Sequence, residues 1–277
     1  MRIRFRFAKL GKIRFTSQRD VARMWERALR RAGLPLDYTK GFSPRPQLSF
    51  GLALPTGCES LAEYVDVVLD GPRAEAAGVE VDELPERLTH LLPAGIDVRA
   101  AAPADRNAGS LQQLVTSCSW TMTFNGVTRA ELESQVASLL GASSVPIERE
   151  RKGKQEHDDL RPSVLDLTVS DDTEGSGRPT GPAAGGSIGV TAELGTQPRG
   201  VRPIELVRGL IAVSGGPGDA GSTSGTGATR TQGVPVLDRA CRTQQWIERD
   251  GIRREPLAVS GGAMGDARAA HALERAS

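Results

Sequence analysis

The first 32 residues change their hydrophobic period once, and this change constrains the fold more than any other feature of the chain. Residues 2–7 alternate arginine with isoleucine or phenylalanine, which is the period of a strand buried on one face. We expect the arginines to point outward and the apolar residues inward. From residue 18 onward apolar residues recur every three or four positions, as in a helix with one face in a core. That face consists of Val21, Met24, Trp25, Ala28, Leu29 and Ala32.

Both ends of this helix carry recognisable signals. Ser17 precedes it, and Asp20 follows three residues later, as in an acidic version of the capping box. Gly33 and Pro35 are typical of a helix end. The sequence therefore predicts a strand followed by a well-delimited amphipathic helix.

The elements that follow suggest that one arrangement occurs twice. The expected ones are extended segments at 47–54 and 62–69, a helix at 81–92 and a strand at 96–101, then a strand at 119–125, a helix at 129–140, a hairpin made of 145–151 and 164–169, a strand at 187–194 and a helix at 203–213. The order strand-helix-strand-strand-helix-strand is the split β-α-β of ferredoxin-like folds. We therefore expect an α+β protein of two tandem ferredoxin-like halves, residues 1–102 and 118–212. Glycine and serine dominate the start of 213–277, which predicts a low-complexity linker and tail that is largely disordered.

Positive charge is concentrated at the start of the chain. Residues 1–50 hold thirteen Lys/Arg and three Asp/Glu, a balance of +10, whereas the whole chain sums to +1. Such segregation points to a polyanionic partner, above all nucleic acid. Solvated charge on an ordinary helix is the alternative, but Glu26 is almost the only acid available for pairing on the arginine-rich face.

A glycine- and proline-punctuated loop, residues 40–46, follows the helix. Its prolines restrict the backbone, and Phe42 is a candidate stacking platform for an unpaired base. The loop is also explained as a tight connection between two elements. A second basic element, residues 148–154, would extend the same groove if the halves pack side by side, or would be a solvated hairpin tip. The RNA-binding candidates are Arg14, Arg19, Arg23, Arg27, Arg30, Lys40, Phe42, Ser43, Arg45, Lys152 and Lys154.

No catalytic or metal site stands out. The three histidines are far apart, and the three cysteines lack the close spacing that an iron–sulfur cluster needs, so we expect no cofactor. Asp66 is the one acid worth testing, although a strand acid paired with a neighbouring arginine explains it better. Cys58 is interpreted as a turn residue. There is neither a transmembrane run nor a signal-peptide core, so we expect a cytoplasmic protein without membrane contact.

Several short blocks resemble one bacterial family. They are residues 14–17 with Asp20, 26–28 with 30–31, 41–46, 48–50 and 53–57, with later matches at 151–154 and 161–162. Over about residues 1–212 the chain resembles the radical SAM-linked protein family, a domain found as a separate protein or attached to a cobalamin-binding radical SAM protein. Family members often have histidine at the position of Gln18, and sometimes at that of Cys58.

The resemblance implies a partner but no activity. We expect an RNA-binding accessory module for a separate radical SAM enzyme, with rRNA or tRNA as the RNA, and favour a non-catalytic role. The alternatives are an RNA-processing or RNA-modifying enzyme in its own right, suggested by fold analogy alone, and a protein–protein adaptor.

Overall fold

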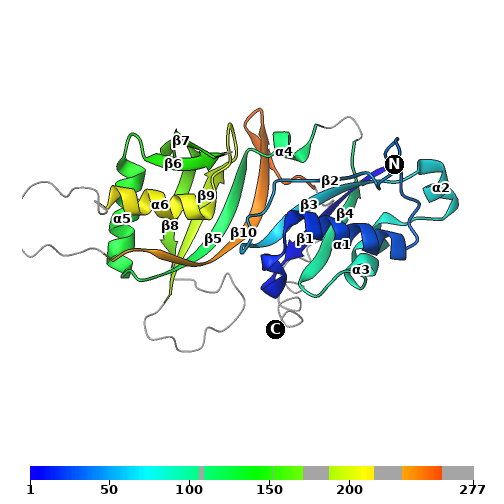
Figure 1. Cartoon of the computed structure of the whole chain (residues 1–277), viewed down its shortest axis with the longest axis horizontal. Helices are drawn as coiled ribbons and strands as arrows, with labels where there is room; N and C mark the ends of the chain where they lie inside the picture. Colours follow the sequence, from blue (N-terminus) through cyan, green and yellow to red (C-terminus); the bar gives the residue numbers. More distant parts are fainter. Residues whose placement is uncertain (106–108, 152, 171–186, 215–232, 258–277) are drawn as a thin grey trace, which may run out of the picture. The chain divides into compact units, whose positions relative to one another are not determined.

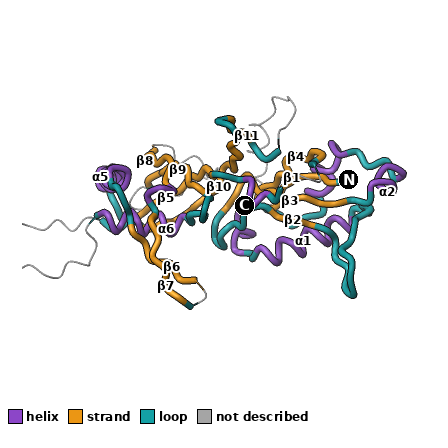
Figure 2. Tube along the Cα trace, turned by 90° about the horizontal axis from the view of Figure 1, so that it is seen from above, coloured by secondary structure: helices purple, strands orange, loops and turns teal. Residues whose placement is uncertain are grey.

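The computed structural model describes residues 1–105, 109–151, 153–170, 187–214 and 233–257 (Figures 1 and 2). The chain divides into two compact units, Met1–Thr116 with Arg242–Ser277 (unit 1) and Ser117–Cys241 (unit 2). Both combine helices with strands, and the cores are built mainly on sheets. Among the described residues no helix is both long and apolar enough to span a membrane.

Unit 1 is built on antiparallel strands in the order β4-β1-β3-β2, with β10 also beside β3. Its elements are β1 (Arg2–Lys9), η1 (Gly11–Phe15), α1 (Gln18–Arg31), β2 (Leu48–Phe50), β3 (Glu59–Val68), α2 (Gly71–Ala76), η2 (Val81–Glu83), α3 (Leu84–Thr89), β4 (Ile96–Pro103), α4 (Leu111–Leu114), the end of β10 (Val236–Arg249) and β11 (Ile252–Arg254).

Helix α1 covers one face of this sheet, as its periodicity predicts (Figure 1). Val21, Trp25, Ala28, Leu29 and Ala32 are buried, and Met24 packs at the edge of the same core. The Trp25 ring lies 5.6 Å from that of Phe5 and 5.1 Å from that of Phe7. Of the predicted capping box, the Ser17 N-cap is confirmed, because the Asp20 amide donates to Ser17 Oγ over 3.2 Å. Asp20 Oδ2 accepts from the Ser17 hydroxyl over 2.7 Å.

The opposite face of the sheet corrects the expectation that the arginines of β1 point into solvent. Arg4 is buried and makes two hydrogen bonds to the Asp66 carboxylate, of 2.7 and 2.9 Å. Its third contact is the Pro256 carbonyl oxygen, 2.9 Å from Nη1. Leu111 and Leu257 pack with Tyr64 on this face. The sheet of unit 1 is therefore covered on both sides, and this face is polar because charged side chains pair there.

Two further expectations for unit 1 need adjustment. The helix expected at 81–92 is split into η2 and α3, because Pro85 has no N–H to donate to the Val81 carbonyl. Residues 236–254, expected within a largely disordered tail, form β10 and β11. Gln245, completely buried on β10, donates a hydrogen bond to the Ala62 carbonyl. The remaining tail segments, 215–232 and 258–277, lie outside the described residues.

Unit 2 places its strands in the order β10-β5-β9-β8. Its elements are β5 (Ser117–Asn125), α5 (Arg129–Gly141), β6 (Pro146–Arg151), β7 (Lys154–Asp159), η3 (Arg161–Ser163), β8 (Val164–Ser170), β9 (Ile188–Gly195), α6 (Pro203–Val213) and the start of β10. Alternate residues of β5 are buried, and α5 contributes Leu132, Val136 and Leu139 to the core, as expected.

The predicted hairpin of 145–151 with 164–169 is wrong. β6 pairs with β7 in a separate two-stranded sheet, and β8 pairs with β9. Gly153, with φ of +74°, allows the tight turn between β6 and β7. β7 consists of polar residues only, so it has no hydrophobic alternation from which a strand is predicted.

Gly209 of α6 lies in close contact with the core of unit 2. A Cβ atom on Gly209 would overlap Leu160 Cδ2, and Leu160 is completely buried. We expect Gly209→Ala to lower the free energy of unfolding by about 1–3 kcal/mol, the usual cost of overpacking. Gly141 ends α5 with open space around it, so Gly141→Ala should be neutral or stabilise by up to about 1 kcal/mol. Urea denaturation of both variants measures the difference; equal stabilities would contradict the packing.

Candidate nucleic-acid interface

Four arginines form a row along the exposed side of α1. Their spacing of four, four and three residues places Arg19, Arg23, Arg27 and Arg30 on one side of the helix, opposite the buried face. All four side chains are exposed. The helical geometry therefore brings these sequence-predicted residues together.

Acidic residues compensate only half of this row. Arg23 lies 3.5 Å from Asp20, and Arg30 lies 3.3 Å from Glu26. Arg19 and Arg27 have no ion pair with any described residue. Exposed pairs contribute little, about 0–1 kcal/mol, so even the paired arginines remain available to an incoming anion.

Arg14 lies in a different environment. Its guanidinium is 3.6 Å from a Glu59 carboxylate oxygen and lies over the Phe15 ring, 4.5 Å from the centroid. Its side chain is about three-quarters buried. Arg14 therefore links η1 to the start of β3, and most of its side chain is inaccessible to a ligand.

The loop after α1, residues 37–47, is held together by hydrogen bonds between its two sides, and we call it the arm. The Thr39 amide donates to the Arg45 carbonyl over 2.9 Å, the Gln47 amide donates to the Asp37 carbonyl over 3.0 Å, and the Arg45 amide donates to Thr39 Oγ1 over 3.1 Å. Residues 38–45 are exposed, which includes the candidates Lys40, Phe42, Ser43 and Arg45. The two sides of the arm are therefore fixed to each other, and its tip is open to solvent.

Phe42 at this tip is fully exposed, so it is not a core residue. Among the described residues the exposed aromatic side chains are Phe15, Tyr38 and Phe42. All three lie in the segment that brackets α1, which also holds the uncompensated arginines. Exposed aromatic rings cost solvation free energy, and such rings in a segment rich in cations are typical of surfaces that bind another molecule.

The second basic element is only partly described. Lys152 lies outside the described residues, and Lys154 begins β7 in unit 2 with a side chain that is not described. Neither candidate gains or loses support from its surroundings.

A group of buried ionisable residues lies on the β1 and β3 strands and at the unit 1 end of β10. Glu63 is 3.2 Å from Arg242, and both side chains are almost completely buried. Burial raises the pKa of the Glu63 carboxyl, while the positive charge of Arg242 opposes that shift. Burial likewise lowers the pKa of the Lys9 ammonium and raises that of the Cys58 thiol. The group packs inside unit 1, and Asp66 is held by Arg4 as the sequence favoured.

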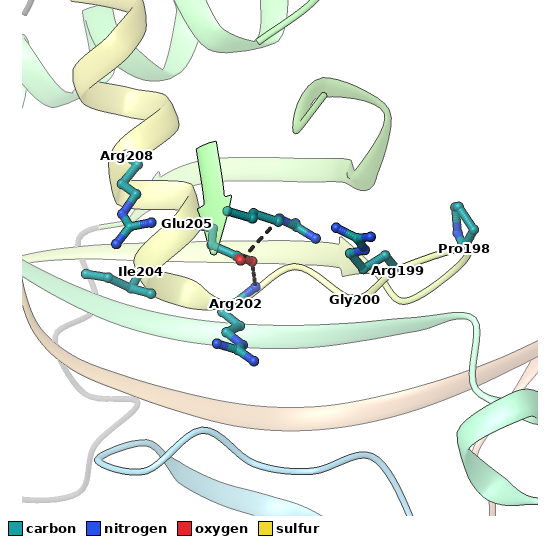
Figure 3. A pocket seen from close by; sticks show the side chains of 8 residues that line it. Pro198, Arg199, Gly200, Arg202, Ile204, Glu205 and Arg208 are labelled. Carbon is teal, nitrogen blue, oxygen red and sulfur yellow. Dashed lines mark hydrogen bonds and ion pairs between the residues drawn. The ribbon is translucent and has the colours of Figure 1, made fainter. Parts of the chain in front are cut away.

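A pocket in unit 2 contains arginines that the sequence analysis missed. It lies around the start of α6, and its lining includes Arg149, Arg199, Arg202 and Arg208 (Figure 3). Three of these arginines flank Pro203, a common first residue of helices, and that grouping was the available signal. In the described part of the chain, no group of three or more His, Cys, Asp or Glu residues is arranged to hold a metal ion.

Comparisons with known proteins give a family and distant structural neighbours. No curated protein matches the sequence. One similar solved structure is described as an H/ACA RNP bound to a substrate RNA containing 2′-deoxyuridine, with a TM-score of 0.40 and 9% identity. The match covers 87% of this chain and 47% of the other, so the chain spans about half the length of that neighbour.

The family comparison covers most of the chain. The matching family is described as an uncharacterized protein conserved in bacteria, and the match extends over residues 2–196. The matched residues include α1, the arm and most of unit 2 before α6. The chain therefore belongs to this uncharacterized bacterial family, DUF2344.

Proposed function

We propose that this protein binds RNA through unit 1, with the exposed side of α1 contacting phosphates and the tip of the arm contacting a base. The fully exposed Phe42, on an arm fixed by hydrogen bonds and flanked by Lys40 and Arg45, is the observation that carries the proposal. An unpaired base stacks on such a ring whatever its identity, and nearby cations hold the backbone.

The charge of α1 supports the same function. Arg19 and Arg27 lack acidic partners among the described residues, and Arg23 and Arg30 have only exposed ones. Like charges at helical spacings destabilise a helix, and an RNA backbone removes that repulsion while releasing its counterions. A protein partner would have to bring a dense acidic surface to achieve the same compensation.

We also propose that each unit is a ferredoxin-like half. The order β4-β1-β3-β2 of unit 1 and the order β10-β5-β9-β8 of unit 2 both support it, because in each the strands follow the spatial order 4-1-3-2 of the split β-α-β. The role as a cytoplasmic accessory to a separate radical SAM enzyme, acting on rRNA or tRNA, rests on the sequence resemblance.

The first prediction concerns α1. Arg27→Gln should weaken binding of a single-stranded oligouridylate and reduce the slope of log affinity against log salt by about 0.7, the value for one phosphate contact on a single strand. Arg73, an exposed arginine of α2, provides the matched control: Arg73→Gln should change neither quantity. Fluorescence anisotropy over a salt series measures both. Equal slopes for the two variants, or no binding of the oligonucleotide at low salt, would refute the assignment.

The second prediction concerns the arm. Phe42→Ala should cost about 1–3 kcal/mol of RNA binding, the usual worth of one base–aromatic stack, without changing the salt slope. Arg45→Ala should instead reduce that slope. Ile252, an exposed apolar residue of β11, serves as control, since Ile252→Ala removes apolar surface away from the arm.

Thermal denaturation separates binding from folding in this experiment. Because Phe42 contacts no core, its replacement should leave the melting temperature unchanged. A lowered melting temperature would return the arm to a structural role, and unchanged RNA affinity at normal stability would favour an adaptor that binds protein. Binding of a partner protein with an affinity that does not depend on salt would favour the adaptor role as well.

A further inference from the structure

The pocket beside α6 has a volume of about 620 Å³, within the range of sites that hold small organic ligands. It is formed entirely by unit 2, from β6, the loop before α6 and the first two turns of α6 (Figure 3). It is a site separate from the α1 surface, and the proposed RNA binding by unit 1 does not depend on it.

One arginine of the pocket is a structural part of its wall. Arg149 is nine-tenths buried and lies 3.1 Å from Asp158 and 3.2 Å from Glu205. The other Glu205 oxygen accepts the Arg202 amide over 2.7 Å, which caps α6. Among the described lining residues Glu205 is the one acid; both of its oxygens are therefore occupied, and its negative charge is neutralised by Arg149.

The other three arginines of the pocket differ in whether they have acidic partners. Arg199 has ion-pair partners in Glu156, at 2.9 Å, and Asp158, at 3.6 Å. Arg202 and Arg208 are exposed, and neither has an ion pair with a described residue. Arg208 Nη1 makes only a long hydrogen bond of 3.4 Å to a backbone carbonyl, that of Glu148. Two guanidinium groups are thus free to bind an anion at the pocket.

The anion that fits this arrangement is a phosphate monoester. Such a group carries about −1.5 to −2 charges at pH 7, which two guanidiniums match, and arginine binds phosphate in bidentate geometry. The start of α6 adds the positive end of a helix dipole. A monoester is favoured over the singly charged diester inside an RNA chain because the pocket concentrates two uncommitted cations.

Apolar side chains belong to the same lining. The Ile204 side chain, near Arg208 and Arg202, is about half exposed, and Pro198 is exposed at the other end of the lining, beyond Arg199 (Figure 3). A pocket of this size exceeds what inorganic phosphate alone would fill, and the apolar side chains offer contact to a sugar or base. We propose that this pocket binds a nucleotide by its 5′-phosphate monoester, either free or at the end of an RNA.

Calorimetric titration of the full chain with adenosine 5′-monophosphate, adenosine and citrate tests the ligand class. The monophosphate should bind at least tenfold more tightly than adenosine or citrate, since only it combines the dianion with an apolar part. Citrate binding as tightly as the monophosphate would show general anion attraction and overturn the proposal, and so would equal binding of adenosine.

Variants then locate the site. Arg202→Gln and Arg208→Gln should each weaken monophosphate binding about tenfold or more, as for loss of a charge-assisted hydrogen bond. Arg129, an exposed arginine at the start of α5 in the same unit, provides the control, and Arg129→Gln should bind normally. Unchanged melting temperatures exclude unfolding as the cause. Equal affinities for all three variants would place the nucleotide elsewhere and overturn the assignment.

A second pair of ligands distinguishes a free nucleotide from the 5′ end of an RNA. If the ligand is an RNA end, 5′-phosphorylated tetra-adenylate should bind more tightly than its 5′-hydroxyl form, and Arg202→Gln should abolish the difference. If the ligand is a free nucleotide, the monophosphate alone should bind better than either oligonucleotide. Because Phe42→Ala leaves this pocket intact, failure of RNA binding by unit 1 and failure of the pocket are separately visible.

Discussion

The buried contact between Arg4 and Asp66 is the interaction on which unit 1 depends most. The sheet packs its apolar face against α1, and without further contacts the opposite face of β1 and β3 would be exposed to water. Instead the bidentate pair neutralises a buried guanidinium, and its third contact, to the Pro256 carbonyl, fixes a distant part of the chain over that face. Removing one partner from such a pair costs about 3–5 kcal/mol because the other charge stays buried. The closing segment around Leu257 is thereby bound to the first strand.

This dependence explains which parts of the fold the sequence predicts. Helix α1 follows from the period of Val21 to Ala32 and from the Ser17 cap, since both signals are local. The strand β7 has no such signal because its residues are all polar, and β10 lies in sequence predicted to be disordered. β10 is ordered by contacts with β3, such as that of Gln245 with Ala62. Contacts between residues so far apart in the chain produce no local hydrophobic pattern from which a strand could be predicted.

The candidate sites show the same limit. The row of arginines on α1 is predictable because helical spacing alone brings its members together. The sequence indicates Phe42 as a candidate but leaves two interpretations of its loop open, and its full exposure comes from the structure. The pocket of unit 2 is not predictable in this way. Arg149 reaches it from β6, Arg202 from the residue before α6 and Arg208 from α6 itself, and only the folded unit 2 brings β6 next to α6.

Charge counting by itself therefore gives an incomplete account of where this chain binds anions. Residues 1–50 carry ten net positive charges, yet Arg4 and Arg14 in that segment are committed to Asp66 and Glu59. The rest of the chain is net negative, yet Arg202 and Arg208 in it have no ion pair with a described residue, and they line a pocket whose carboxylate, Glu205, is already neutralised by Arg149. A cation can bind an external anion only where no acidic partner already occupies the end of its own side chain. By that criterion Arg27 and Arg202 are equivalent, although they lie in segments of opposite net charge.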